Sequence, residues 1–268
     1  MHLSDAARDQ GVRVLSLSEG APGAPEVGAL VPPDHGPLEA LNGATFDGGL
    51  LLRIPPGVTL DAPIRIHLDA PAEGLSVPRI LVDVGRGASV TVVEEHTGGA
   101  RGRVASVTEL HVGDAAQVRH VILQAWAASA RGHLTFRARV GRDAKLVTAL
   151  ASFGGERVKM DLGATLAGPG ARSELLGFAL GEGAQHLDHH TVHEHTAPDT
   201  WSNLEFKAVL ADQSRSTYTG RIRIVEGAPR SEAYQENRNL ILGAEARADT
   251  IPELEILTDV VLYSHAAT

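Results

Sequence analysis

Cysteine is absent from the 268-residue sequence, and aromatic residues are scarce. Without cysteine, the chain offers no disulfide, no thiolate nucleophile and no cysteine-ligated metal site. Two Trp, three Tyr and five Phe leave few aromatic rings for the surface. A solenoid that binds carbohydrate needs such exposed rings, so the composition does not favour that function.

Positive charge is in the minority. The chain has 24 Lys and Arg against 33 Asp and Glu, which gives a net charge of -9. A surface of this sign repels nucleic acids and anionic membranes, so we expect neither as a partner. The opening residues MHLSDAARDQ show no basic segment followed by an apolar stretch, and no run approaches the roughly 20 apolar residues of a membrane helix. We therefore expect a cytoplasmic protein that binds other proteins or small ligands.

Helix signals are confined to about the first forty residues. Ser4 is placed to cap a short turn over residues 5–10, and Pro37 to open another around residues 38–41. We predict a short, mostly irregular or helical N-terminal segment over residues 1–44 and one β domain over residues 45–268, with no linker between further domains.

Hydrophobic residues alternate with polar ones through the rest of the chain. In the segment 134–140, the side chains of Leu134, Phe136 and Val140 share one face, whereas Arg137 and Arg139 share the other. Residues 221–224 and 253–256 alternate in the same way. This period of two predicts strands with one buried face.

A turn phrase recurs between these strands, in which a hydrophobic residue and a glycine or proline precede a small residue. The phrases occupy residues 54–58, 84–88, 112–116, 140–144 and 167–171, so their last residues are spaced by 30, 28, 28 and 27. Later phrases at 210–214, 225–229 and 242–246 follow at intervals of 15 and 17, about half that period. Two strands per period explain both spacings and predict a β-solenoid whose coils stack on one another. A β-sandwich with regularly spaced hairpins is the alternative.

The densest polar cluster lies at residues 186–195. On a strand, His189, Thr191, His193 and His195 point to one side, while Asp188, His190 and Glu194 point to the other. Imidazoles suit Zn and Fe, so His189, His193 and His195 are candidate ligands of a metal-dependent β-helical or cupin-like enzyme. The alternative is a polar ladder on a solenoid face in which one or two histidines are buried and hydrogen-bonded.

Other catalytic motifs are missing from the sequence. It has no Gly-x-Ser-x-Gly elbow, no phosphate-binding loop ending in Lys-Ser or Lys-Thr, and no dinucleotide-binding glycine fingerprint. The sequence therefore lacks the motifs that acyl transfer and nucleotide hydrolysis require. Asp and Glu are plentiful on the predicted strands, so their number does not exclude a catalytic carboxylate pair of the kind found in a β-helical polysaccharide lyase or hydrolase.

The last eighty residues contain a series of distinctive phrases: Asp188-His189-His190-Thr191, Tyr218-Thr219-Gly220-Arg221-Ile222, Gln235 with Asn237 and 239–242, Pro252-Glu253-Leu254-Glu255-Ile256, and Ser264-His265-Ala266-Ala267-Thr268. In their order and spacing, these phrases resemble the SufB and SufD core family of iron-sulfur cluster assembly proteins. Weaker matches extend it to about residues 45–268. The resemblance implies an all-β, right-handed parallel β-helix, in agreement with the solenoid predicted from the turns.

The resemblance also implies a non-enzymatic scaffold. Family members pair through their β-helices and dock a SufC ATPase through a C-terminal helical region, and a nascent cluster is built where SufB meets SufD. The SufD histidine of the Ser-His phrase lies at that interface. It follows that His265, together with Asp259, is the candidate for contact with iron or a cluster.

The chain departs from the family pattern in the Asp-Asp-Val-Lys-Cys-Ser-His phrase, which here reads Asp259-Val260-Val261-Leu262-Tyr263-Ser264-His265. Because the thiolate is missing, we expect the SufD branch rather than SufB, with iron or a cluster held only transiently and together with SufB. We also expect a homodimer in isolation. The helical region that docks SufC has almost no counterpart here, so SufC binding is the least supported of these expectations.

Overall fold

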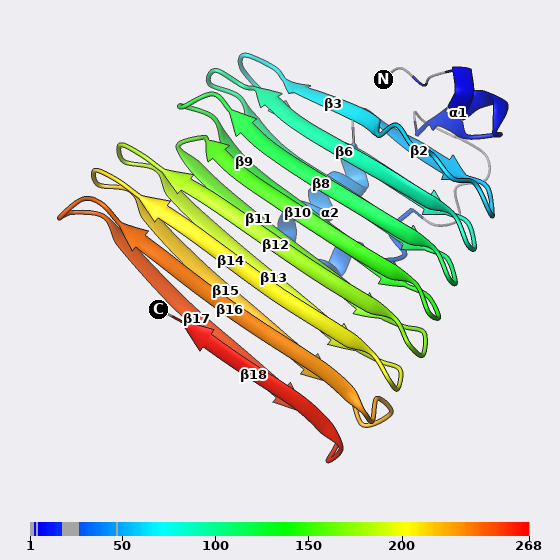
Figure 1. The fold of residues 1–268 in the computed structure, drawn as a ribbon. Coiled ribbons are helices and arrows are strands. Elements are labelled where there is room, and N and C mark those ends of the chain that lie inside the picture. The colour runs from blue at the N-terminus through cyan, green and yellow to red at the C-terminus, as the bar shows by residue number, and fades with distance from the viewer. Residues whose placement is uncertain (1–2, 4, 18–26, 47, 268) are drawn as a thin grey trace.

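The structure, a computed structural model, describes residues 3, 5–17, 27–46 and 48–267 (Figure 1). Its helices are α1 (Asp5–Asp9), the 3-10 turn η1 (Pro33–His35) and α2 (Pro37–Thr45). The strands are β1 (Arg13–Ser16), β2 (Gly48–Ile54), β3 (Ile64–Ala70), β4 (Leu75–Ser76), β5 (Pro78–Val84), β6 (Ser89–Gly98), β7 (Arg103–Val112), β8 (Gln117–Trp126), β9 (Arg131–Val140), β10 (Lys145–Gly154), β11 (Arg157–Leu166), β12 (Arg172–Gly181), β13 (His186–His195), β14 (Trp201–Leu210), β15 (Arg215–Ile224), β16 (Ser231–Ile241), β17 (Arg247–Ile256) and β18 (Val261–Ala267).

Two parallel sheets face each other and form a β-solenoid. Within the described residues, sheet A follows the order β1-β2-β5-β7-β9-β11-β13-β15-β17, with β4 beside β7, and sheet B follows β18-β16-β14-β12-β10-β8-β6-β3. From β5 onward, successive strands alternate between the sheets, so each of these coils contains one strand of each sheet (Figure 1). The predicted parallel β-helix with two strands per period is thereby confirmed, and the β-sandwich is wrong.

The recurring turn phrase is the connection from sheet A to sheet B, and the packing between coils explains its residues. Its final alanines, Ala88, Ala116, Ala144 and Ala171, are all buried. A Cβ on Gly113 would lie 2.7 Å from the carbonyl oxygen of Val84, in the turn of the preceding coil. The residue before the alanine adopts a positive φ, as at Ala115 (57°) and Asp143 (53°). The phrase therefore encodes close stacking and a left-handed residue.

Side chains on the inner faces of the two sheets fill the solenoid. In β9, Leu134, Phe136, Ala138 and Val140 are buried, as the alternation predicts. Two positions of this strand that the alternation places outside, His133 and Thr135, are buried as well, because α2 covers the outer face of sheet A beside them.

The N-terminal segment contains both predicted helical regions and one strand that the sequence did not reveal. Helix α1 spans Asp5–Asp9 and α2 spans Pro37–Thr45, whereas the predicted cap Ser4 lies outside the described residues. Strand β1 pairs antiparallel with β2, in a segment that was expected to be irregular or helical. Four residues carry too little alternation to distinguish a short edge strand from a loop.

A buried ion pair fastens the loop before α2 to sheet A. The Nη2 of Arg79 lies 2.6 Å from Oε1 of Glu109, and both side chains are almost completely buried. Glu109 also accepts hydrogen bonds from the backbone N–H groups of residues 28, 30 and 31, and Arg79 donates to Asn42 Oδ1 on α2. Every charge-bearing atom of the pair thus has partners, which a buried pair needs in order not to destabilise the fold.

The last coil that the structure describes has exposed apolar side chains. In the described chain, β17 and β18 are the last strands of sheets A and B. Large apolar side chains are exposed on β16, β17 and β18 and on the connections between them: Leu240, Ile241, Leu242, Ile251, Leu254, Leu257, Val260, Leu262 and Tyr263. Leu254 and Tyr263 differ in this from Ile222 and Ala233, the residues beside them in the preceding coil, which are buried. The buried face predicted for residues 253–256 is therefore wrong for Leu254, which is 38% exposed.

We predict that Gly113→Ala and Ala115→Gly change stability in opposite directions although they lie in one turn. A Cβ at 113 collides with backbone atoms and should lower the free energy of unfolding by about 1–3 kcal/mol, as overpacking does. Removing the Cβ at 115 relieves a left-handed alanine and should raise it by up to about 1 kcal/mol. Urea unfolding followed by circular dichroism checks both; the same sign for the two substitutions would contradict the assigned roles.

We predict that Arg79→Met lowers the free energy of unfolding by about 3–5 kcal/mol, because it leaves the Glu109 carboxylate buried without its counter-ion. Adding Glu109→Gln should recover part of this loss. The control is Arg101→Met, which removes an ion pair to Glu73 whose side chains are 77% and 72% exposed; it should cost less than about 1 kcal/mol. Equal costs for the buried and the exposed pair in urea titrations would refute the interpretation.

Candidate functional site: the polar interior and the terminal coil

Strand β13 directs its histidine cluster into the solenoid. Its burial alternates along the strand, so that His189, Thr191, His193 and His195 lie inside, whereas Asp188, His190 and Glu194 lie on the outer surface. The predicted division of the cluster between two faces is confirmed. The inner face is the solenoid core rather than a partly exposed surface, and three histidines are buried where one or two were expected.

Hydroxyl groups from neighbouring strands and turns are the partners of two of these histidines. The Nδ1 of His195 lies 2.7 Å from Thr200 Oγ1, and its Nε2 lies 2.9 Å from Ser202 Oγ. Thr200 continues the contact to Ser231 in the next coil at 2.7 Å. His193 Nε2 lies 3.0 Å from Ser173 Oγ. These contacts form a buried polar column that crosses from β13 of sheet A to Thr200 in a turn and to the first residues of β12, β14 and β16 in sheet B.

His189 is held by packing instead. Its ring lies over Phe206, with centroids 4.8 Å apart, and Phe206 stacks in turn on Tyr218 at 4.6 Å. Neither ring nitrogen of His189 has a hydrogen-bond partner among the described residues. The Tyr218 hydroxyl lies 2.8 Å from Thr191 Oγ1, so the tyrosine bridges the polar column and the aromatic stack.

Burial keeps these imidazoles neutral. It lowers the pKa of His189 to about 4 and that of His195 to about 4. For His193, burial and then the nearby His195 lower the pKa to about 3. A neutral imidazole is the form that binds metal, but in the described part of the chain no three His, Cys, Asp or Glu side chains are grouped to hold an ion. The interior is therefore a hydrogen-bonded core, and the three candidate ligands share no metal position.

A second buried cluster surrounds Glu94, which the motif search did not single out. Its carboxylate lies 2.7 Å from His120 Nε2, 3.3 Å from His96 Nε2 and 3.0 Å from Thr108 Oγ1. Burial alone would raise the pKa of Glu94, but His120 and then His96 outweigh it and lower the pKa to about 2. The alternation of Val90, Val92 and Glu94 was the available signal, because it places the carboxylate on the inner face.

The two residues proposed for contact with iron or a cluster both lie in the terminal coil. Asp259 is exposed in the bend before β18, and His265 is exposed on β18, where it is in register with Gln235 of β16. No hydrogen bond or ion pair between them is observed. The structure thus places both residues on the open end of the solenoid, separate from the buried histidines.

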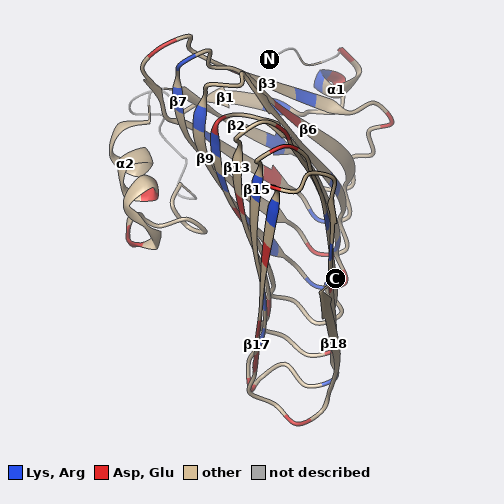
Figure 2. Cartoon of the chain, turned by 90° about the vertical axis from the view of Figure 1, so that its left-hand side faces the viewer, with Lys and Arg blue, Asp and Glu red and all other residues tan. Residues whose placement is uncertain are grey.

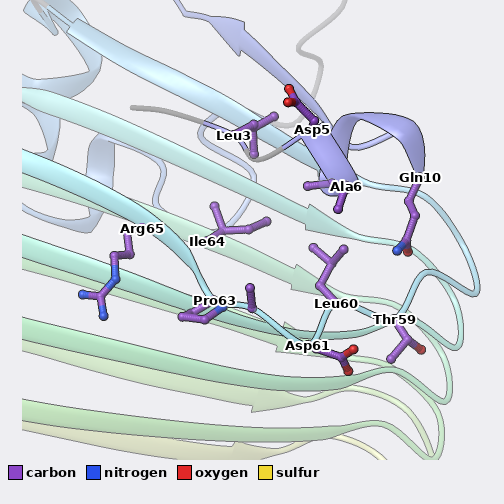
Figure 3. A pocket seen from close by; sticks show the side chains of 12 residues that line it. Leu3, Asp5, Ala6, Gln10, Thr59, Leu60, Asp61, Pro63, Ile64 and Arg65 are labelled. Carbon is purple, nitrogen blue, oxygen red and sulfur yellow. The ribbon is translucent and has the colours of Figure 1, made fainter.

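A cleft of about 590 Å³ lies at the opposite end, between α1 and residues 59–65 (Figure 3). Leu3, Leu60 and Ile64 supply its apolar lining, and the carboxylates of Asp5 and Asp61 lie apart from each other (Figure 3). Because they lie apart, the two carboxylates do not form a catalytic pair.

Among the described helices, none is both long and apolar enough to cross a membrane.

The fold defines a β-solenoid protein with a partly polar core, and comparison with known proteins specifies the family. Residues 67–268 match the family described as SUF system FeS cluster assembly, SufBD core domain. The chain belongs to this SufBD family.

Curated relatives agree with the family match. The chain is 30% identical over 266 residues to the iron-sulfur cluster assembly SufBD family protein Rv1462 of Mycobacterium tuberculosis, covering 96% of this chain and 66% of the relative. It is 28% identical over 242 residues to the iron-sulfur cluster assembly protein SufB of Bacillus subtilis, covering 89% of this chain and 52% of the relative. The chain therefore spans between about half and two thirds of the length of these relatives.

We predict that His189→Leu weakens the dependence of stability on pH. The folded protein holds His189 neutral down to a pKa of about 4, whereas the unfolded chain takes up a proton near pH 6.5. The stability contributed by the neutral ring is therefore complete above pH 6.5 and is lost as the pH falls from 6.5 toward 4.

Going from pH 7 to pH 5, the free energy of unfolding should fall by about 2 kcal/mol less in His189→Leu than in the unsubstituted chain. This range excludes most of the titration of Glu94, whose contribution is lost between pH 4.5 and about 2. His186→Leu, at an exposed histidine of the same strand, is the control and should leave the pH dependence unchanged. Urea titrations at both pH values measure the free energy of unfolding. The prediction would be disproved if this free energy changed by the same amount between pH 7 and pH 5 in the two variants.

Proposed function

We propose that this chain is a non-catalytic, SufD-type scaffold subunit of the SUF system that works in the cytoplasm with SufB and SufC. The family supports a role in iron-sulfur cluster assembly. The absence of cysteine favours the SufD-type role, since the chain supplies no thiolate for a cluster. Iron or the nascent cluster is the cargo of this role, bound transiently and together with SufB.

The open terminal coil carries the proposal. Strands β17 and β18 present backbone groups with no further strand beside them in the described chain, and the apolar side chains around them are exposed, with Leu262 at 62% and Leu242 at 63%. Such an edge pairs readily with a strand of a second protein. In this proposal SufB covers the edge in the complex, and a second copy of the chain covers it in isolation.

His265 lies on the strand that this pairing covers. As an exposed imidazole on β18, it would face the partner with both ring nitrogens free of any contact that the structure shows. Asp259 adds a carboxylate in the bend that precedes the same strand. Imidazole and carboxylate both bind iron, so these two residues suit transient contact with iron at a shared interface.

We predict that Leu262→Glu weakens pairing with SufB at least tenfold, because it places a charge in an apolar contact that must be desolvated. Leu176→Glu, at a residue 36% exposed on the outer face of sheet B, is the matched control and should pair normally. Isothermal titration calorimetry with purified SufB measures the affinity, and size-exclusion chromatography with light scattering measures the homodimer. A strict monomer that does not bind SufB would overturn the proposal.

His265→Ala separates the role of the interface from the role of the histidine. The variant should keep its affinity for SufB, while the complex reconstituted anaerobically with SufC, iron and sulfide should retain less iron. Elemental analysis and Mössbauer spectroscopy measure the iron. Unchanged iron in a fully assembled His265→Ala complex would exclude the residue from cargo contact and leave the pairing itself supported.

A further inference from the structure

A row of basic residues crosses sheet A on its outer surface. Six successive strands, β7 to β17, each begin with a basic residue or histidine, and the strand register places these residues side by side. We call them the basic row: Arg103, Arg131, Arg157, His186, Arg215 and Arg247. All six are exposed. Figure 2 shows blue segments recurring along the strands of this sheet.

The basic row is unfavourable for the isolated chain. Like charges directly opposite one another on neighbouring strands repel, and adjacent strands are only about 4.8 Å apart. The chain has nine more acidic than basic residues, yet within the described residues only Arg131 of this row forms an ion pair, to Glu156. Arg103, Arg215 and Arg247 form none. A bound anionic partner would relieve this repulsion.

An apolar groove runs beside the first half of the row. It has a volume of about 400 Å³ and passes along β7, β9 and β11 at the edge of helix α2. Leu38 on α2 and Leu75 on β4 form its walls and are 39% and 47% exposed. Arg103, Arg131 and Arg157 line it as well, so apolar surface and positive charge meet in one place.

The floor of the groove contains a polar atom without a partner. His133 is 8% exposed, and its Nε2 lies 2.7 Å from Glu39 Oε1. Its Nδ1 has no hydrogen-bond partner among the described residues. His133 lines the groove together with the charged residues Lys159 and Asp188, and its Nδ1 is itself buried.

We propose that the groove and the basic row form a docking surface for an acidic segment of a partner polypeptide, with an apolar side chain of that segment seated between Leu38 and Leu75. The row extends over five strand spacings, about 24 Å, which is longer than a small anion can use. The anchoring groove distinguishes a peptide from a nucleic acid, which would also meet the net negative charge of the chain. The groove lies on the side of the solenoid along β7, β9 and β11, away from the terminal coil, and the basic row reaches that coil only at Arg247 of β17.

The test uses the full chain and a defined probe set: fluorescein-labelled 12-residue peptides of Asp and Glu with one Leu or Phe at each position in turn. Matched peptides carry Lys for each acid, or Ser for the apolar residue. Fluorescence anisotropy at about 50 mM and 200 mM NaCl should show binding by acidic peptides with an apolar residue, weakened at the higher salt. Lys peptides should not bind, and Ser peptides should bind several-fold more weakly.

Two double variants locate the binding. Arg103→Gln with Arg157→Gln should weaken the acidic peptide about tenfold. Arg119→Gln with Arg172→Gln removes the same charge from exposed positions of sheet B and should have no effect. Leu38→Ser should abolish the preference for Leu or Phe over Ser. Circular dichroism and thermal unfolding confirm that the variants are folded.

Three results would overturn the proposal. One is that no acidic peptide binds at the lower salt concentration. Another is that both double variants weaken binding equally, which would indicate a general charge effect. The third is that oligo-dT of twelve nucleotides or dodecanoate binds the row more tightly than every peptide, which would assign the surface to a polyanion or a small amphiphile. Pairing with SufB should be unchanged by the substitutions at Arg103 and Arg157, so failure here leaves the proposed function standing.

Discussion

Every feature of this protein depends on the parallel, in-register stacking of one coil on the next. The register places each side chain beside its equivalent in the adjacent coil. A favourable contact between equivalent residues therefore recurs along a column, and an unfavourable contact, such as repulsion between like charges, recurs in the same way. The buried residues Ala88, Ala116, Ala144 and Ala171 form such a column in the turns that lead to sheet B. The arginines at the starts of the strands of sheet A show the opposite case, a column retained despite repulsion.

The same stacking permits a polar interior. Buried histidines and hydroxyls would be costly as isolated groups, but Thr200 and Ser231 occupy equivalent turns and so meet each other and His195. Burial then holds the imidazoles neutral, and Glu94 stays ionised because His120, His96 and Thr108 surround it. Because the sequence has no cysteine, this polar interior contains no thiolate.

The period of two and the spacing of the turns were sufficient to predict the solenoid, because both arise from local backbone geometry. The faces of His189 and His190 followed from the same period. The roles of His133 and Thr135 did not, since their burial depends on α2, which comes from a segment about ninety residues earlier. The same holds for Arg79 and Glu109, whose pairing needs the contact between coils. The exposure of Leu254 depends on which strands stack beyond it, and alternation carries no information about that.

The tight turn through Gly113 and Ala115 also makes one coil the step by which the length of the solenoid can change. Each coil contacts only its neighbours, so a duplication or deletion of one complete coil between β11 and β15, beyond the strands that α2 and η1 contact, would preserve the packing on both sides. It would change the distance between α2, beside β7 and β9, and β18 by a single strand spacing, about 4.8 Å. Within such a family, the separation of two binding surfaces can therefore evolve in fixed steps, without redesign of either surface.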